Sequence, residues 1–207
     1  NTRLLGLCRE FGIDAIGVSG VDAGLVKAHK RAPVTLASGE VVDYGMVGDI
    51  DGVDGSVITR LLDAGFLPVV SPLSCDAGGH LLNINADTVA AAIGGALVAE
   101  KLILCTGAQG ILERLDDPQS LISYTDLAGL RRLREEGALS DGMLPKSSAI
   151  ELAIRGGVRR VHVISYAAAD ALLAEIFTNE GTGTLVVRDT KALSAAEQGA
   201  AEPGAGA

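Results

Sequence analysis

The segment "HLLNINADTVAAAIGGALVAEKLIL" (residues 80–104) decides the fold, because it predicts a strand end, a turn, a helix and a second strand in succession. Three polar residues, Asn83, Asn85 and Asp87, gather at the turn where the helix begins. A helix needs only one N-cap residue, and Asn85 or Asp87 could supply it. The additional polar groups at this corner therefore indicate a binding site as well as a cap.

Strands and helices alternate along the rest of the chain, which is typical of βαβ units and a largely parallel sheet. Helical spacing predicts helices at residues 2–11, 56–64, from 88, 125–136, 146–155 and 170–177. Strands are predicted at residues 15–20, 66–73, 101–106, 160–165 and 182–187, with a hairpin arm at 42–50 that turns at Gly45 and Gly48. Residues 188–207 are small, polar and rich in Gly and Ala, and this composition predicts a disordered tail.

Composition narrows the class of protein. A net charge of −9 argues against a nucleic-acid partner, which would need a basic face. The longest apolar run, residues 89–99, is too short to span a bilayer, and no signal-peptide pattern opens the sequence. Cys8, Cys75 and Cys105 are odd in number and widely spaced, without a metal-ligand pattern. We therefore expect a cytoplasmic metabolic protein with reduced thiols, no membrane partner and no metal site built from its own residues.

Glycine-rich and polar loops follow several of the predicted strands. Besides the corner at residues 83–87, these are "SGVDAG" (residues 19–24), "TGAQGIL" (106–112) and "SDGMLPK" (140–146). Ligands of open parallel sheets bind at the carboxyl ends of the strands, where such loops meet. Plainer interpretations stay open, since Asn83 and Asn85 could be turn formers and "GAQG" a flexible loop.

Lys146 is a candidate of a different kind. Pro145 suits the first position of a helix, which places Lys146 in the first turn. The helix dipole disfavours a cation there by about 0.3–1 kcal/mol, and an anion such as phosphate at the same end would reverse the sign. The alternative is an exposed lysine without a role.

Three segments resemble the acetylglutamate kinases of the amino-acid kinase superfamily: "GHLLNINADTVAAAIGGALVAEKLILCT", "DGMLPKSSAIELAIRGGVRRVHVIS" and "LLAEIFTNEGTGTLV". The resemblance covers about residues 1–187. It implies an α/β fold, a three-layer αβα sandwich with a mainly parallel sheet. In that fold residues 1–86 are the remainder of the amino-acid-substrate lobe and residues 87–187 the nucleotide-binding lobe. The implied reaction is phosphorylation of the side-chain carboxylate of N-acetyl-L-glutamate by ATP with Mg²⁺, in arginine biosynthesis, by a homo-oligomer that is a dimer or hexamer.

The resemblance also assigns roles to single residues. Asn83 holds the acetylglutamate and Asn85 shares its corner, while Asp87 orients the catalytic lysines and Lys146 neutralises charge on the transferred phosphoryl group. The expected nucleotide contacts are Gly107, Ala108, Gln109, Gly110, Ile111, Leu112, Ala138, Leu139 and Ser140. His162, Glu175 and Gly183 match positions that bind arginine in members inhibited by it, although Glu175 could also be a plain surface residue of a helix.

Two departures from the family pattern leave alternatives open. Gly107 stands where many relatives have an aspartate. The family fold also begins with two Gly-rich loops, one with a second catalytic lysine, and with a substrate-binding arginine; none of these precedes Asn1. We therefore expect residues 1–207 alone to be inactive as a kinase. The alternatives are a kinase for an aminoadipate-type substrate, and a non-catalytic regulatory relative that binds nucleotide.

Overall fold

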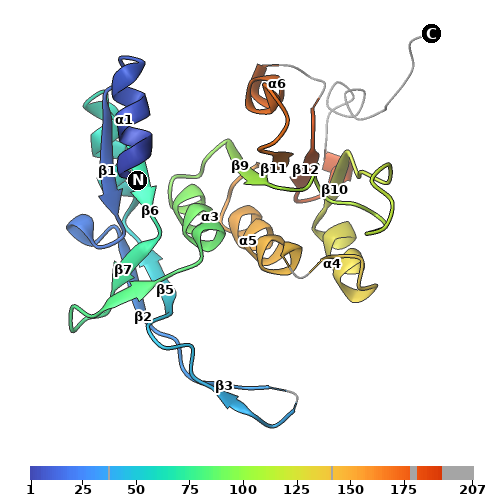
Figure 1. Ribbon diagram of the computed structural model, residues 1–207, viewed down its shortest axis with the longest axis horizontal. Helices are drawn as coiled ribbons and strands as arrows, with labels where there is room; N and C mark the ends of the chain where they lie inside the picture. The colour runs from blue at the N-terminus through green and yellow to red at the C-terminus, as the bar shows by residue number, and fades with distance from the viewer. Residues whose placement is uncertain (37, 141, 178–180, 193–207) are drawn as a thin grey trace. The chain divides into compact units, whose positions relative to one another are not determined.

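The chain folds into two compact units, Asn1–Leu97 and the residues from Val98 onward (Figure 1). The structure is a computed structural model that describes residues 1–36, 38–140, 142–177 and 181–192. The expected boundary before Asp87 would have separated helix α3 (Ala86–Ala96) from the first unit. The structure keeps α3 in that unit because the helix packs against strand β5 (Gly48–Val53).

The first unit contains three α-helices, one 3₁₀ turn and short strands in three sheets among its described residues. The helices are α1 (Thr2–Glu10), α2 (Gly55–Asp63) and α3, with the 3₁₀ turn η1 (Asp22–Gly24). The strands are β1 (Ala15–Ser19), β2 (Val26–Lys30), β3 (Val34–Thr35), β4 (Val41–Val42), β5, β6 (Leu67–Ser71), β7 (Leu73–Cys75) and β8 (Leu81–Asn83). β1 pairs with β6 in parallel, and a second sheet has the order β5-β2-β7-β8.

Apolar side chains from β2, β8, α2, α3 and the residues next to β2 and β8 build the core of the first unit. Its buried members are Leu25, Val26, Ala28, Ile58, Leu82, Ile84 and Val89. The N-cap residue of α2 is Asp54, whose carboxylate accepts a hydrogen bond of 3.0 Å from the Ser56 N–H. The core fixes β8 and the start of α3, and so it positions the polar corner between them.

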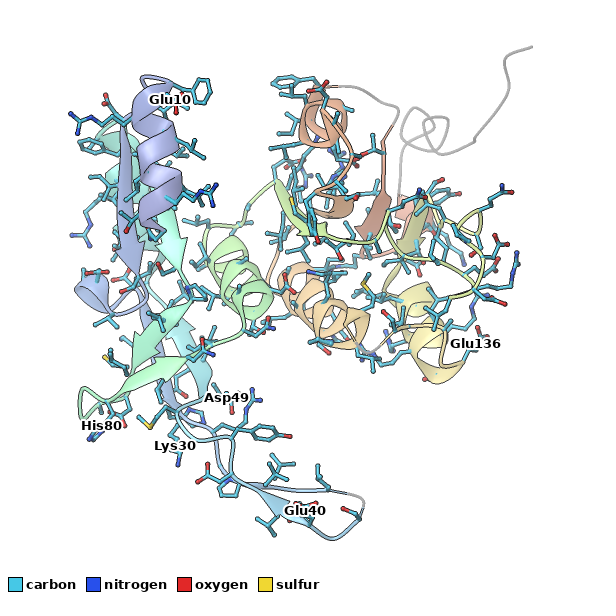
Figure 2. The ribbon with its side chains drawn as sticks, in the orientation of Figure 1. Glu10, Lys30, Glu40, Asp49, His80 and Glu136 are labelled. Atoms are coloured by element: carbon cyan, nitrogen blue, oxygen red, sulfur yellow. The ribbon has the colours of Figure 1, made fainter. Side chains whose placement is uncertain are left out.

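Charged pairs hold the base of the β3–β4 hairpin. The Arg31 guanidinium donates to Asp49 at 3.0 Å, and the Lys30 ammonium donates to Asp43 at 3.1 Å. Figure 2 shows Lys30 and Asp49 near the start of the hairpin and Glu40 further along it. Hydrogen bonds from Arg31 hold the pKa of the Asp49 carboxyl below its usual range, so this pair is ionised near neutral pH.

The second unit is one mixed sheet with helices on both faces. The strands are β9 (Lys101–Thr106), β10 (Tyr124–Asp126), β11 (Arg160–Ser165) and β12 (Thr184–Val187), in the order β10-β12-β11-β9. β12 runs antiparallel to β11, while the other two pairs are parallel. Helices α4 (Leu127–Glu135) and α5 (Met143–Arg155) lie on one side and α6 (Ala171–Phe177) on the other (Figure 1).

The predicted α/β class is confirmed, and β9 and β11 have the bounds expected from the sequence. Three predicted helix starts differ from the structure by two or three residues. The helix expected from residue 88 begins at Ala86, directly after its N-cap residue Asn85. The helix expected from residue 125 begins at Leu127, because Thr125 lies in β10 and the Asp126 carboxylate caps the helix by accepting from the N–H groups of Ala128 and Gly129. The helix expected from residue 146 begins three residues earlier, at Met143.

Gly48 is not a turn residue. It is the first residue of β5 and is buried, and a Cβ there would lie 2.9 Å from the Leu82 Cβ. Glycine at this position therefore serves close packing of β5 against β8. The turn lies at Gly45, which has a left-handed φ of 69° that glycine adopts readily.

Residues 188–192 open the predicted tail, yet they are held by hydrogen bonds. The Arg188 guanidinium donates to the Ile154 carbonyl at 3.0 Å, and Thr190 opens the 3₁₀ turn η2 (Thr190–Ala192). The remainder of that prediction, residues 193–207, lies outside the described residues. Within the part of the chain that the structure describes, no helix is long and apolar enough to cross a membrane.

Candidate active site

The polar corner of the first unit lies between β8 and α3. Asn85 is the N-cap of α3, since its side-chain oxygen accepts a hydrogen bond of 3.1 Å from the Thr88 N–H. Asn83 ends β8, and its backbone N–H donates to the Met46 carbonyl at 2.8 Å, while the residue is exposed. Asp87 lies in the first turn, where the helix dipole favours a carboxylate. Because Asn85 alone caps the helix, Asn83 and Asp87 stay candidates for binding.

The loop after β9 has an exposed half and a buried half. Gly107, Ala108 and Gln109 are exposed, whereas Gly110 and Ile111 are buried. The Ile111 N–H donates to the Thr184 hydroxyl at 2.8 Å. The interpretation as a flexible loop is therefore wrong for the buried half, which is anchored to β12.

The hydrogen bond between Ile111 and Thr184 leaves room only for glycine at position 110. A Cβ at this position would lie 2.7 Å from the Thr184 Oγ1 and 2.8 Å from the Leu121 Cδ1. Leu112 forms an isolated antiparallel bridge with Leu121, and the Ile111 carbonyl accepts from the Ile122 N–H at 2.9 Å. The buried residues therefore hold the exposed residues 107–109 in place at the carboxyl end of β9.

Residues 138–140 lead into α5. The Leu139 side chain is buried, and the Ser140 carbonyl accepts a hydrogen bond of 2.8 Å from the Met143 N–H. Gly142 is the N-cap residue and has no side chain with which to cap the helix. Pro145 is the third helical residue rather than the first, which is tolerated because the first four N–H groups of a helix lack intrahelical partners. The Leu144 N–H donates to the Ser140 carbonyl at 3.1 Å, and Pro145 has no N–H. An anion at this end of α5 would therefore be attracted by the helix dipole rather than by open N–H groups of residues 143–145.

Lys146 lies in this first turn and is only 8% exposed. The interpretation as an exposed lysine is wrong. The helix dipole disfavours a cation near the positive end of a helix. Phosphate at this helix end would favour the lysine charge, so the position suits phosphate binding.

His162 and Glu175 form a buried pair in the second unit. The His162 Nδ1 lies 2.5 Å from the Glu175 Oε1, and the Thr182 N–H donates to Oε2 at 2.9 Å. Glu175 is 5% exposed, so its interpretation as a surface residue is wrong. The hydrogen bond from His162 holds the pKa of the Glu175 carboxyl below its usual value, against the opposing effect of burial. The His162 Nε2 is buried and has no hydrogen-bond partner among the described residues.

Gly183, the third residue expected in an arginine site, lies against the backbone of β11. A Cβ there would collide with the Val163 carbonyl oxygen. The glycine is therefore explained by close packing of the segment before β12, whether or not arginine binds nearby.

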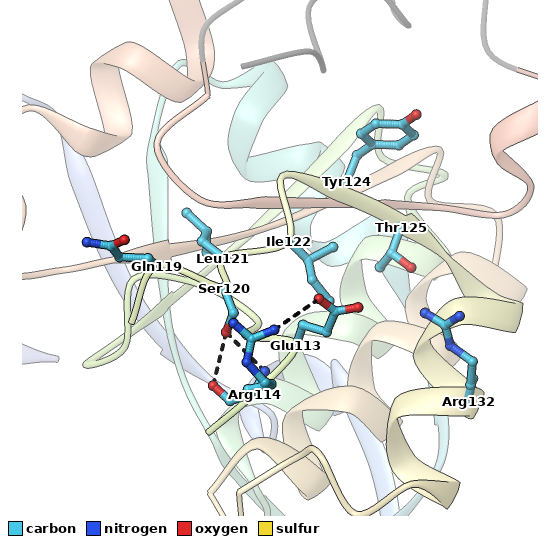
Figure 3. A pocket seen from close by; sticks show the side chains of 9 residues that line it. All are labelled: Glu113, Arg114, Gln119, Ser120, Leu121, Ile122, Tyr124, Thr125 and Arg132. Carbon is cyan, nitrogen blue, oxygen red and sulfur yellow. Dashed lines mark hydrogen bonds and ion pairs between the residues drawn. The ribbon is translucent and has the colours of Figure 1, made fainter. Parts of the chain in front are cut away.

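Sequence reasoning missed a polar surface cavity of about 430 Å³ in the second unit (Figure 3). It opens beside the Leu112–Leu121 bridge and is lined by Glu113, Arg114, Gln119, Ser120, Leu121, Ile122, Tyr124, Thr125 and Arg132. Arg114 pairs with Asp117 and lies 3.9 Å from Glu113, so its charge is largely balanced. No motif in the sequence marks these residues.

Among residues 1–36, 38–140, 142–177 and 181–192 no group of three or more His, Cys, Asp or Glu side chains could hold a metal ion. Sequence reasoning also missed Tyr166, which directly follows β11. An aromatic residue at the carboxyl end of a predicted strand is a signal that could have identified it as a candidate binding residue.

The fold and these motifs agree with known proteins. A model of the amino acid kinase family matches residues 1–165, and the chain belongs to this family. The chain is 47% identical over 194 residues to the acetylglutamate kinase of Myxococcus xanthus, a match that covers 91% of this chain and 63% of the relative. It is 45% identical over 182 residues to the acetylglutamate kinase of Symbiobacterium thermophilum, covering 88% and 62%. The predicted relationship to acetylglutamate kinases is thereby confirmed, and the chain spans just under two thirds of these relatives.

A solved structure shares the fold. The N-acetylglutamate synthase from Neisseria gonorrhoeae, complexed with coenzyme A and L-arginine, matches with a TM-score of 0.69 and 27% identity over 86% of this chain and 38% of that one. A synthase and kinases thus share one fold, and function has to be argued from the site.

Proposed function

We propose that this protein is an acetylglutamate kinase, which transfers the γ-phosphate of ATP to the side-chain carboxylate of N-acetyl-L-glutamate and gives N-acetylglutamyl 5-phosphate. The observation that carries the proposal is Lys146, buried in the first turn of α5 within the segment "GMLPK". The 47% identity to the Myxococcus xanthus acetylglutamate kinase supports it. The cell compartment we propose is the cytoplasm.

The second unit is proposed as the nucleotide-binding lobe. The positive end of the α5 dipole and the Lys146 ammonium suit phosphate oxygens, and residues 107–112 and 138–140 would contact the rest of the nucleotide. Mg²⁺ is typically held by one or two carboxylates together with phosphate oxygens, so the ion would bind with ATP. When bound, it neutralises charge on the phosphates. Lys146 would stabilise the negative charge that develops on the phosphoryl group during transfer.

The first unit is proposed as the remainder of the amino-acid lobe. Asn83 and Asn85 carry side-chain amides, which can donate to and accept from the acetylamino group of the substrate. Asn85 already uses its oxygen as the helix cap, which leaves its NH₂ group as a donor. Asp87 is proposed to orient the catalytic lysines. In the whole enzyme we propose a three-layer αβα sandwich with a mainly parallel sheet, assembled as a homo-oligomer.

The test compares two versions of the protein. One version consists of residues 1–207 alone, and the other carries the leading segment of the Myxococcus xanthus relative before Asn1. N-acetylglutamate-dependent release of ADP is expected from the extended version only. Turnover of the chain as given at an ordinary kinase rate of about 1–100 s⁻¹ would show that the site has been assigned wrongly.

Lys146 is tested in the extended version. Lys146→Ala should lower kcat by about 10²–10³-fold, as expected for loss of a group that stabilises transition-state charge, and leave the KM for N-acetylglutamate nearly unchanged. Lys191→Ala, at an exposed lysine in η2, is the matched control and should behave like the parent. A Lys146→Ala variant with undiminished turnover would remove this residue from the mechanism.

Two other functions are separated by the same assay. A kinase for an aminoadipate-type substrate would prefer the acceptor that is one methylene longer, although one methylene changes discrimination by only about 1–3 kcal/mol. A non-catalytic relative, which Gly107 favours, would bind nucleotide and phosphorylate neither acceptor.

We also propose that arginine regulates the enzyme through His162, Glu175 and Gly183. Glu175 is a buried carboxylate of the kind that binds a guanidinium, but its two oxygens are already engaged by His162 and Thr182. Arginine would therefore have to replace at least one of these partners. Inhibition of the extended version by millimolar arginine would support the proposal, and indifference to arginine would count against it.

A further inference from the structure

Tyr166 is an exposed aromatic residue beside the proposed nucleotide loop. It directly follows β11, whose last residue, Ser165, is in register with Thr106 at the end of β9. The Tyr166 N–H donates to the Thr106 carbonyl at 3.0 Å, which carries the pairing one residue beyond the strand. Tyr166 and Gly107 therefore stand side by side at the carboxyl ends of two adjacent strands.

The phenol end of the Tyr166 ring lies close to Gly107. A Cβ at Gly107 would be 3.1 Å from the phenol oxygen, 3.6 Å from Cζ and 3.8 Å from Cε1. A side chain at position 107 would be in tight contact with the phenol oxygen, so glycine leaves room for the tyrosine beside the loop. Tyr166 nevertheless stays 73% exposed. A ring that is held against a loop and still open to solvent is already arranged to receive a flat ligand, at a small cost in side-chain entropy.

We propose that Tyr166 is the platform on which the adenine base of the nucleotide stacks, and that Gly107 leaves room for it. The inference deepens the proposed function and rests on it, because it needs nucleotide at residues 107–112. The base is the part of ATP that an aromatic side chain recognises, since every base has a π-face. The phosphates are bound elsewhere, by the cationic end of α5. Loss of the ring should therefore weaken the binding of nucleotides and leave the binding of a ligand that has phosphates but no base unchanged.

The experiment uses the full chain and two probes, ADP and inorganic tripolyphosphate, titrated by calorimetry. Tyr166→Ala should weaken the affinity for ADP by about tenfold or more, within the range expected for loss of one base–aromatic stack, and leave the affinity for tripolyphosphate unchanged. Tyr166→Phe keeps the ring and should match the parent chain. Phe177→Ala removes another exposed aromatic side chain, 77% exposed at the end of α6, and serves as the control.

Fluorescence gives an independent measurement, because the chain has three tyrosines and no tryptophan. In a Tyr44→Phe, Tyr124→Phe double variant only Tyr166 emits, and stacking of adenine should quench that emission. Tripolyphosphate should leave it unchanged.

The outcomes separate this inference from the proposed function. If Tyr166→Ala binds ADP as the parent does, the platform is wrong while the nucleotide site stands. If Tyr166→Phe is as weak as Tyr166→Ala, the hydroxyl rather than the ring recognises ADP, and stacking is wrong. If the parent chain binds no ADP, the nucleotide site and the inference fail together.

Discussion

Glu175→Gln should destabilise the second unit in a way that depends on pH. In the parent chain both carboxylate oxygens accept hydrogen bonds, one from the His162 Nδ1 at 2.5 Å and one from the Thr182 N–H at 2.9 Å. An ionised carboxylate only accepts, whereas glutamine turns one of its two polar atoms into a donor. One of the two contacts is then lost or reversed in a site where Glu175 is 5% exposed.

The magnitude follows from these contacts. Hydrogen bonds to charged groups contribute about 1.5–3 kcal/mol each, and a buried polar group without a partner costs about 1–3 kcal/mol. We therefore expect Glu175→Gln to lower the free energy of unfolding by about 1–3 kcal/mol near neutral pH. Glu175→Ala removes both acceptors and should lower it by about 3–5 kcal/mol.

The pH dependence has a definite sign. The pKa of Glu175 is lowered from its ordinary value of 4.5, chiefly by the hydrogen bond from His162. A carboxyl group with a lowered folded-state pKa contributes its full stability above the unfolded-state pKa, and loses it as the pH falls through the folded-state pKa. The difference between parent and Glu175→Gln should therefore be largest at neutral pH and shrink below about pH 4.5.

Hydrogen exchange of the β11 amides measures this effect in the second unit by itself, and urea unfolding followed by circular dichroism measures it across the chain. Glu136→Gln, at a side chain that is 59% exposed, is the control and should change stability by less than about 0.5 kcal/mol. The reasoning is refuted if Glu175→Gln changes stability no more than this control, or if its effect at about pH 3, below the ordinary carboxyl pKa, is the same as at about pH 7.

Three further predictions concern the anchors of the candidate site. Thr184→Val should destabilise the second unit by about 1–3 kcal/mol in urea unfolding, because the buried Ile111 N–H loses its acceptor, whereas Thr184→Ser should not. Asn85→Ala should cost about 1 kcal/mol and speed hydrogen exchange in the first turn of α3; unchanged exchange there would show that the cap is dispensable. Gly183→Ala should lower the melting temperature, since its Cβ meets the Val163 carbonyl and overpacking costs about 1–3 kcal/mol, and an unchanged melting temperature would contradict the packing described.

The sequence by itself was sufficient for the α/β class and for β9 and β11. β9 contains the apolar run 102–105 between Lys101 and Thr106, and β11 has Val161, Val163 and Ile164 between Arg160 and Ser165, so their limits are local properties. The sequence narrowed the cap of α3 to Asn85 or Asp87, because caps act within a few residues of the chain, and the structure assigns it to Asn85. Lys146 does lie in a first turn as predicted, although Pro145 is the third helical residue and not the first. The family follows from motif order, which is likewise a property of sequence alone.

Only the tertiary structure decided which side chains are buried and which segments pair. β7 and β10 have three residues each, too few to show a period, and they are strands because β2 and β12, which lie far away in the chain, pair with them. The burial of Lys146 and the contact of His162 with Glu175 depend on packing among helices and strands that the sequence does not place. Tyr166 meets Gly107 for the same reason, since the register of β11 against β9 brings together two residues that lie far apart in the chain.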